Sequence, residues 1–180
     1  MSQQPEITSA AKRIYLLGFM GTGKSYWGKL WASHHGMSFS DIDEMIEQVE
    51  KDTITGIFEN AGEDYFRVKE ASILRDQVTG NDCIIACGGG LPCFYDNMKW
   101  MNEHGLTVFL SAGPRYILSK VLDEIEKRPL LKNFNEAELL FFIEQKLAER
   151  HPFYSQAKIV LDAESIDINS LDEIVASLNK

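Results

Sequence analysis

The sequence predicts an α/β fold with a parallel sheet, because short apolar segments alternate along the chain with segments of helical periodicity. The clearest unit lies between residues 13 and 30, where an apolar run of strand length precedes a glycine-rich turn and then apolar residues at helical spacing. A second indication is the continuous apolar run from Cys83 to Cys87, as expected for a strand covered on both faces of a sheet.

The other elements follow from apolar spacing, capping residues and glycine or proline boundaries. Strands are expected at residues 14–17, 37–40, 83–87, 106–110 and 159–161. Helices with both ends expected lie at 24–35, before the stop at Gly36, and at 41–49, 63–79 and 135–150. Three more helices are expected: one that ends at His104, one that begins at Pro114 and one that follows Ser170. Caps are expected from Thr53, from Asn135 with Glu138, and from Ser170 with Glu173. Ligands of such folds bind where the parallel strands end, so the motifs that follow the strands should converge.

The turn after the first strand matches the P-loop pattern G-x-x-x-x-G-K-[ST] from Gly18 to Ser25. Glycines let the backbone N–H groups surround phosphates, and the helix that follows adds its positive N-terminal end. Lys24 can reach the β- and γ-phosphates, and the Ser25 hydroxyl can ligate Mg²⁺. A chance glycine-rich loop is the alternative, but both flanks have the required strand and helix. The expected phosphate-binding residues are Gly21, Thr22, Gly23, Lys24 and Ser25.

Length and composition indicate one soluble domain, 1–180, with a short polar tail at 1–11. The net charge of −9 should repel nucleic acids and anionic membranes, so an anionic ligand has to be held by local arginines and lysines. No apolar run is long enough to span a bilayer, and the N-terminus lacks the apolar core of a signal peptide. Cys83, Cys87 and Cys93 lack metal-site spacing, which favours the reducing cytoplasm. Cys83 and Cys87 lie in an apolar run, so we expect these two to pack in the core.

Two acidic residues, Asp41 and Asp43, follow the second expected strand. One acid near Mg²⁺ and one near an acceptor hydroxyl is the arrangement that phosphoryl transfer to an alcohol requires. A helix N-cap with a solvated neighbour is the alternative, and the nearby P-loop favours the functional interpretation.

Arg67 shares one helical face with Glu63 and Glu70, because these residues are four and three positions away. This pattern fits an ordinary surface ion pair and, equally well, an arginine oriented to bind a substrate carboxylate through two parallel hydrogen bonds. The residues alone leave both interpretations open.

Gly88, Gly89 and Gly90 suggest that a ligand approaches the backbone closely, since a turn rarely needs three glycines. Arg128 lies in a polar segment, about 123–132, and is either a surface charge or a lid arginine that neutralises phosphate charge. Arg150 stands at an expected helix end, where a cation is stabilised anyway, so its spacing alone indicates a structural role.

Taken together, these motifs resemble the shikimate kinases along nearly the whole chain. The matching segments are Gly18–Ser25, Phe39–Glu47, Ile57–Glu70, Gly88–Gly90, Arg128–Leu131 and Glu149–Tyr154. The P-loop is common to many kinases, but the Asp pair, the Phe-Arg-x-x-Glu pattern and the triple glycine together are specific.

The resemblance implies a nucleoside-monophosphate-kinase-like, three-layer fold with a five-stranded parallel sheet. It implies transfer of the ATP γ-phosphoryl group to the 3-hydroxyl of shikimate, a step of aromatic amino acid biosynthesis. The substrate would be bound by a segment at about 41–70 and by Asp43, Arg67, the glycines Gly88, Gly89 and Gly90, and Arg150. Asp43 would orient or deprotonate the hydroxyl, and Asp41 would reach Mg²⁺ through water. Lys24, Asp43 and Arg128 would be the catalytic residues.

The chain departs from the family pattern at a few positions. Tyr26 follows Ser25 where a small hydroxyl residue is usual, Cys87 replaces a common threonine, and Lys120 replaces an arginine near the adenine. Tyr26, Lys120 and Arg128 complete the expected ATP site. Two alternatives remain: a kinase of another small polyol acid such as gluconate, and a nucleotide-binding module without catalysis. We expect a cytoplasmic monomer that binds no nucleic acid.

Overall fold

The computed structural model describes residues 12–76, 82–123, 131 and 133–178. Its five strands form one sheet in the order β2-β3-β1-β4-β5, and every neighbouring pair is parallel, as the sequence predicts. The strands are β1 (Arg13–Leu17), β2 (Ser38–Asp41), β3 (Cys83–Ala86), β4 (Leu106–Ser111) and β5 (Ile159–Asp162). The helices are α1 (Lys24–His35), α2 (Ile42–Glu50), α3 (Ile54–Asp76), α4 (Asn97–His104), α5 (Pro114–Asp123), α6 (Glu136–Tyr154) and α7 (Asp172–Ser177), with a 3₁₀ turn at Leu91–Cys93.

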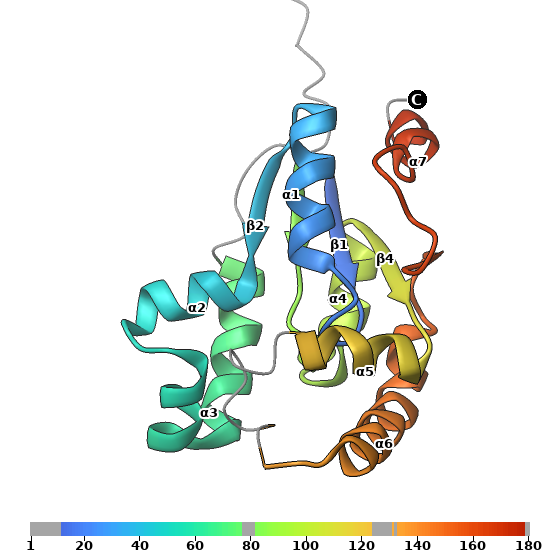
Figure 1. Cartoon of the computed structure of the whole chain (residues 1–180). Coiled ribbons are helices and arrows are strands. Elements are labelled where there is room, and N and C mark those ends of the chain that lie inside the picture. The colour runs from blue at the N-terminus through green and yellow to red at the C-terminus, as the bar shows by residue number, and fades with distance from the viewer. Residues whose placement is uncertain (1–11, 77–81, 124–130, 132, 179–180) are drawn as a thin grey trace, which may run out of the picture.

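Three neighbouring strands end at the same level of the sheet. Ala86, the last residue of β3, is in register with Leu16 of β1 on one side and with Asp41 of β2 on the other. The P-loop, the Asp pair and the triple glycine follow directly after these strands. Figure 1 shows this edge facing α5 in the lower half of the molecule, with α1 running away from it along the sheet. The expected convergence of the three motifs is therefore confirmed.

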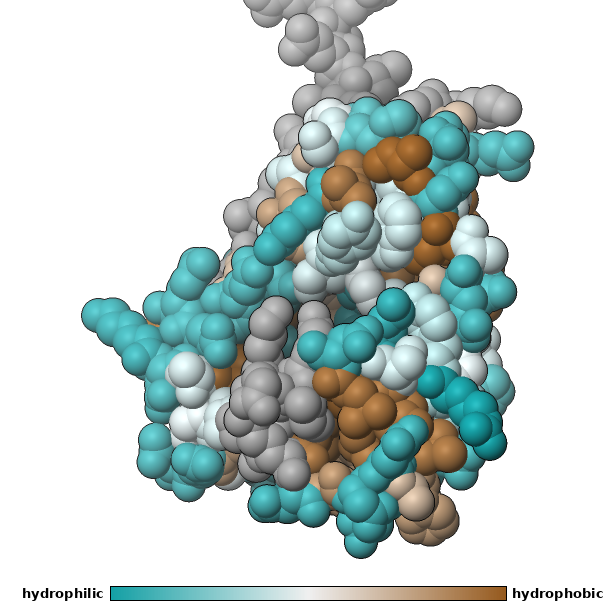
Figure 2. Space-filling view, viewed as in Figure 1, coloured by the Kyte–Doolittle hydropathy of each residue, from teal (hydrophilic) through white to brown (hydrophobic). Residues whose placement is uncertain are grey.

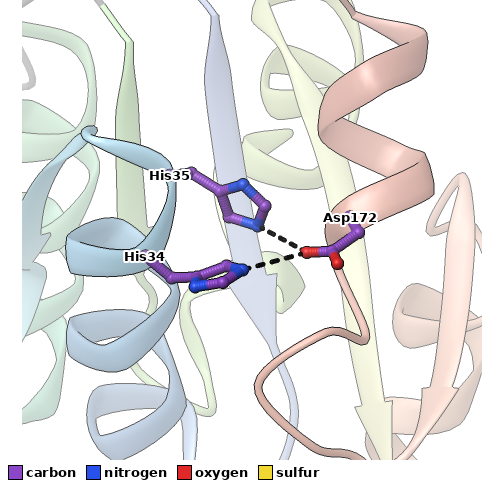
Figure 3. A group of neighbouring side chains, drawn as sticks. All are labelled: His34, His35 and Asp172. Carbon is purple, nitrogen blue, oxygen red and sulfur yellow. Dashed lines mark ion pairs between the residues drawn. The ribbon is translucent and has the colours of Figure 1, made fainter.

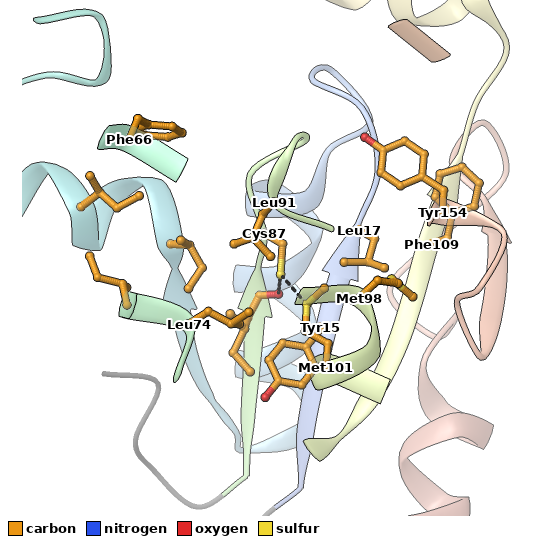
Figure 4. Close-up of a cluster of buried hydrophobic side chains, with 14 of the residues drawn as sticks. Tyr15, Leu17, Phe66, Leu74, Cys87, Leu91, Met98, Met101, Phe109 and Tyr154 are labelled. Atoms are coloured by element: carbon orange, nitrogen blue, oxygen red, sulfur yellow. Dashed lines mark hydrogen bonds between the residues drawn. The ribbon is translucent and has the colours of Figure 1, made fainter. Parts of the chain in front are cut away.

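Alternate residues of the strands supply two separate hydrophobic cores. Tyr15 and Leu17 of β1 face a cluster formed with α2, α3 and α4 and with Tyr154 of α6 (Figure 4). Ile14 and Leu16 point to the opposite face, where Trp31 of α1 packs. This period-two alternation is what places helices on both faces of the sheet. Cys83 and Cys87 are buried in the first cluster, so the expected core packing of these two cysteines is confirmed.

A third cluster joins α5 to α6 and includes Phe19, from the P-loop, and Leu131. Leu131, which belongs to the segment expected to form a lid, is buried in this cluster. Figure 2 shows hydrophobic side chains gathered over α5 and α6 on this face of the molecule. The exposed large hydrophobic residues of these two helices are Leu122 and Phe141.

Several boundaries differ from those expected. Helix α3 spans Ile54–Asp76 but is interrupted at Gly62, whose φ of 84° is not helical, so a separate helical segment begins at Glu63 as predicted. The Thr53 hydroxyl accepts a hydrogen bond from the Gly56 N–H, so its expected cap is confirmed. Residues 77–81, where the stop at Gly80 was expected, lie outside the described residues. Val49 is 45% exposed, because it lies one turn beyond the part of α2 that packs on the core.

The end of α6 and the start of α7 also differ from the prediction. The capping box of Asn135 with Glu138 is present at the start of α6. The helix continues past Arg150 to Tyr154 although the proline at position 152 lacks a backbone N–H. Tyr154 is buried and hydrogen-bonded, and these contacts offset the lost helical hydrogen bond. Ser170 caps no helix, because its hydroxyl bonds to the backbone N–H and side chain of Asp167 instead.

Candidate active site

The P-loop borders a cavity of about 600 Å³ at the carboxyl edge of the sheet. Gly23 has a φ of 84°, a conformation that favours glycine, and α1 begins directly after it. The Lys24 ammonium donates hydrogen bonds of 2.9 Å to the carbonyl oxygens of Gly18 and Phe19. These bonds fold the side chain back over the loop. The cavity is lined by Met20, Gly21, Thr22, Gly23, Lys24, Ser25, Tyr26, Trp27, Asp41, Asp43, Ala86, Cys87, Gly88, Gly89, Tyr116, Lys120 and Asp123.

Two oxygen donors meet beside the loop. The Ser25 hydroxyl donates a hydrogen bond of 2.5 Å to Oδ2 of Asp41, and the other carboxylate oxygen of Asp41 accepts the backbone N–H of Asp43. Asp41 thus caps α2 and, at the same time, presents a carboxylate to the cavity. The N-cap alternative considered for Asp41 is real, and it does not exclude the functional one. The hydroxyl and the carboxylate are hard oxygen ligands of the kind that Mg²⁺ prefers.

Asp43 and Glu70 approach each other around Gly88. A Cβ atom at Gly88 would lie 2.9 Å from Oδ1 of Asp43 and 2.5 Å from Oε1 of Glu70, so any larger residue there would displace the two carboxylates. Both oxygens are buried and have no hydrogen-bond partner among the residues that the structure describes. Burial and the neighbouring Asp41 raise the pKa of Asp43 to about 6. Burial raises the pKa of Glu70 to about 7, although Arg67 opposes the rise.

Arg67 is a buried, oriented cation rather than a surface charge. It is 8% exposed, and its guanidinium donates to Glu63 at 2.9 and 3.1 Å and to Glu70 at 2.5 Å. The ring of Phe94 lies 4.7 Å from the guanidinium carbon. A Cβ atom at Gly90 would lie 2.7 Å from both terminal nitrogens of Arg67. The surface ion-pair interpretation of this residue is therefore wrong, because Glu70 is 1% exposed and Arg67 is buried with it.

Arg150 reaches the triple glycine from α6. A Cβ atom at Gly89 would lie 3.0 Å from an Arg150 terminal nitrogen, and the Tyr154 hydroxyl donates a hydrogen bond of 2.6 Å to the Gly89 carbonyl oxygen. The Arg150 guanidinium also lies over the ring of Phe19, which follows β1. Because α6 continues to Tyr154, Arg150 does not stand at the helix end where the sequence pattern placed it, and the helix-end argument for a structural role does not apply.

A sequence model of the family described as shikimate kinase matches residues 20–179. The chain belongs to the shikimate kinase family. A shikimate kinase from Phocaeicola vulgatus is 39% identical over 173 residues, which cover 93% of this chain and 99% of that protein.

Solved structures of shikimate kinases have the same fold. The enzyme from Bacteroides thetaiotaomicron superimposes with a TM-score of 0.84 at 36% identity, over 94% of this chain and 96% of that chain. The enzyme from Acinetobacter baumannii, solved in complex with shikimate, gives a TM-score of 0.80 at 28% identity, over 95% and 94% of the two chains. The P-loop kinase fold with five parallel strands is therefore established for this chain, and the chain is an ATP-dependent kinase of the shikimate kinase family. Within the described segments, no helix is long and apolar enough to cross a membrane.

The structure brings most residues of the expected shikimate kinase site together. All the expected ATP-binding residues that it describes line the cavity, as do both aspartates, Gly88 and Gly89. Arg67, Gly90 and Arg150 do not line it but adjoin it through the triple glycine. Arg128 lies outside the described residues, as does nearly all of the segment expected to form a lid, of which only Asp123 and Leu131 are described.

Sequence reasoning missed four contributors to this site. Tyr116 of α5 lines the cavity, and its ring lies 5.4 Å from the Lys120 ammonium. Trp27 also lines it, although helical spacing alone assigns this residue to the core. Tyr154 fixes the Gly89 carbonyl, and Glu70 provides the second buried carboxylate. The pattern Phe-Arg-x-x-Glu contained Glu70, but its closeness to Asp43 depends on how α2 and α3 pack.

Proposed function

We propose that this chain transfers the γ-phosphoryl group of ATP to the 3-hydroxyl of shikimate, giving shikimate 3-phosphate and ADP. One observation carries the proposal: a buried carboxylate and two arginines meet around glycines 88–90, directly beside the P-loop cavity. A small acid with several hydroxyl groups, held by these arginines, would present a hydroxyl to a phosphoryl donor bound on the loop. The shikimate complex of the relative from Acinetobacter baumannii supports this choice of substrate.

The phosphates would bind to the loop formed by Gly21, Thr22, Gly23, Lys24 and Ser25. Backbone N–H groups and the N-terminal end of α1 attract the anion, and Lys24 adds a full charge. The ammonium is already held against the Gly18 and Phe19 carbonyl oxygens, so little side-chain freedom is lost when phosphate binds.

Ser25 and Asp41 are suitable oxygen donors for Mg²⁺, because the hydroxyl donates its hydrogen to the carboxylate and leaves its lone pairs for a cation in the cavity that both residues line. We assign Ser25 as a direct ligand and Asp41 as a ligand through water. The bound ion would offset the negative charge of the phosphates.

Asp43 would orient the acceptor hydroxyl and take up its proton. Its orphaned Oδ1 is a hydrogen-bond acceptor without a donor among the described groups, and a substrate hydroxyl would supply that donor. A pKa of about 6 leaves the carboxylate ionised at neutral pH while keeping it more basic than an ordinary aspartate.

Arg67 and Arg150 would bind the substrate carboxylate. Arg67 is held at three points by Glu63 and Glu70, so its planar group is oriented before the substrate arrives. The missing side chains at Gly89 and Gly90 leave both guanidinium groups next to the backbone.

The nucleotide base would lie toward Lys120 and Tyr26. Tyr26 is 64% exposed at the cavity and Lys120 is exposed beside Tyr116, so both side chains are free of core packing. Arg128 remains a proposal that rests on the family pattern: as a lid arginine in the segment 123–132, it would stabilise charge on the transferring phosphoryl group.

We further propose that residues 1–180 act as a single kinase domain, with the substrate-binding segment at 41–70 and a polar tail at 1–11. The net charge of −9 supports the absence of nucleic-acid and anionic-membrane partners. A cytoplasmic monomer remains our proposal for the working state of the protein.

The test is an ADP-release assay with Mg²⁺-ATP, with and without shikimate, and with gluconate and other polyol acids in parallel. We expect ADP release that depends on shikimate, and a product phosphorylated at the 3-hydroxyl by NMR. Equal or faster turnover of gluconate would contradict the assignment of shikimate as the substrate. Nucleotide binding without turnover of any acceptor would support a non-catalytic module.

A further inference from the structure

A group of potential metal ligands lies at the end of α1 that is remote from the P-loop. His34 and His35, in the last turn of α1, face Asp172, in the first turn of α7 (Figure 3). Nε2 of His34 lies 3.3 Å from Oδ1 of Asp172, and Nε2 of His35 lies 3.5 Å from the same oxygen. One ligand atom from each residue falls within 4.8 Å of the other two.

These separations fit a shared ion. Two ligands bound tetrahedrally to Zn²⁺ at about 2.0–2.1 Å are separated by about 3.3–3.4 Å, which is close to both nitrogen–oxygen distances here. The carboxylate oxygen therefore needs little movement to share a metal with either ring. The two imidazoles and one carboxylate are borderline ligands that suit Zn²⁺ better than Mg²⁺.

His35 carries an unexplained polar atom. Its Nε2 is buried and makes no hydrogen bond to any of the described groups, since 3.5 Å to Asp172 is a long contact and not a hydrogen bond. A buried nitrogen without a partner is costly whether or not it carries the proton. A metal ion bound to the lone pair would satisfy this atom and the Asp172 carboxylate together.

The surrounding structure holds the three residues in place without the ion. Trp31, His34 and His35 lie on one side of α1 because they are three and four residues apart. The buried indole of Trp31 donates a hydrogen bond of 2.8 Å to the Asp167 carbonyl oxygen, and the buried Leu171 precedes Asp172. These contacts dock the segment before α7 onto α1. The C-terminal end of α1 also carries the partial negative charge of the helix, which favours a cation.

We propose that His34, His35 and Asp172 form a structural Zn²⁺ site that ties α7 to the C-terminal end of α1, with water completing the coordination on the exposed side. His34 and Asp172 are partly exposed, so an ion can enter without opening the core. The site lies at the far end of the twelve-residue helix α1 from the P-loop. Zinc should therefore change stability and leave phosphoryl transfer unaffected.

The experiment uses the full chain freed of metal by a chelator, without nucleotide or Mg²⁺. Calorimetric titration with Zn²⁺ should give one site per chain, and Zn²⁺ at about a hundred times its Kd should raise Tm by about 5–10 °C. His34→Gln and Asp172→Asn change partly exposed residues and should keep the fold, yet should lose this Tm increase. His151→Gln, an exposed histidine of α6, is the matched control and should keep it.

The same variants separate this site from the catalytic cavity. His34→Gln and Asp172→Asn should retain the wild-type kcat with Mg²⁺-ATP. Two results would overturn the proposal: a wild type that binds no stoichiometric Zn²⁺, or a Zn²⁺-dependent Tm increase that persists in both variants.

Discussion

The candidate site has two halves that obtain their polar groups differently. The proposed phosphate half, residues 18–25, is one continuous segment, in which the P-loop backbone, Lys24 and Ser25 border the cavity. The acid half consists of charged side chains from three separate helices: Asp43 from α2, Arg67 and Glu70 from α3, and Arg150 from α6. They meet only because glycines 88–90 leave room for them.

This difference has an energetic consequence. The phosphate half satisfies its groups locally, as the hydrogen bonds of Lys24 and Thr22 to loop carbonyls illustrate. The acid half keeps two buried carboxyl oxygens without hydrogen-bond partners in the described structure and raises the pKa of both Asp43 and Glu70. Buried carboxyl groups without partners lower the stability of the folded state, and binding sites often accept this cost because a ligand later supplies the missing hydrogen bonds.

Lys24→Ala should lower kcat by about 10³-fold or more, because the loop then lacks its cation for the phosphates. Tm should change little, since Lys24 is not part of any hydrophobic core cluster. Steady-state kinetics and thermal unfolding measure the two effects. Lys29→Ala, on the same helix and paired with Glu44 at the surface, is the control and should remain active. Near wild-type activity of Lys24→Ala would show that residues 18–25 do not bind the reacting phosphates.

Asp43→Asn should lower kcat by about 10²- to 10⁴-fold while Mg²⁺-ATP binding stays nearly intact, because the variant keeps the shape but loses the basic carboxylate. Rates and nucleotide titrations should be compared with Glu44→Gln, an exposed neighbour on α2. The opposite pattern, weak nucleotide binding with surviving kcat, would mean that Asp43 belongs to the metal site and that the two aspartates have exchanged roles.

The two halves were also unequally predictable from sequence. The P-loop lies within eight consecutive residues, and its strand and helix are local, so the pattern predicted its place and its cavity. For Arg67, spacing predicted the contacts with Glu63 and Glu70 but left open whether the arginine was exposed. Burial depends on Phe94 and Gly90, more than twenty residues away, and no local pattern contains that information. Only the resemblance to shikimate kinases favoured a substrate-binding role for Arg67 over a surface ion pair.

Arg67→Lys should raise the KM for shikimate by about 10- to 100-fold and leave the KM for ATP nearly unchanged. Lysine keeps the charge but loses the planar, two-bond contact with a carboxylate, which is worth about 1.5–3 kcal/mol. Arg75→Lys is the matched control, because Arg75 lies on the same helix but bonds to Asn97 and Tyr95 away from the cavity. If the KM values for shikimate and ATP both rose in Arg67→Lys, the assignment of Arg67 to the acid half alone would be wrong.

The pKa of Asp43 predicts a pH-dependent stability. Since burial and Asp41 raise this pKa to about 6, the folded state binds more protons than the unfolded state between about pH 4 and 6, and stability falls as pH rises through that range. Asp43→Asn should therefore be more stable than wild type at pH 8, by about 1–3 kcal/mol, and no more stable at pH 4. Urea unfolding at both pH values measures the difference. A variant that is less stable at pH 8 would show that the Asp43 carboxylate is not a strained group.

We propose that Arg67 and Arg150 bind a substrate carboxylate beside the P-loop. The most direct test compares shikimate with its methyl ester as acceptors for the wild-type enzyme, following ADP release from Mg²⁺-ATP. The ester keeps every hydroxyl group but removes the charge, so we predict a kcat/KM at least about 100-fold lower than that of the acid. Equal kcat/KM values for acid and ester would contradict the claim.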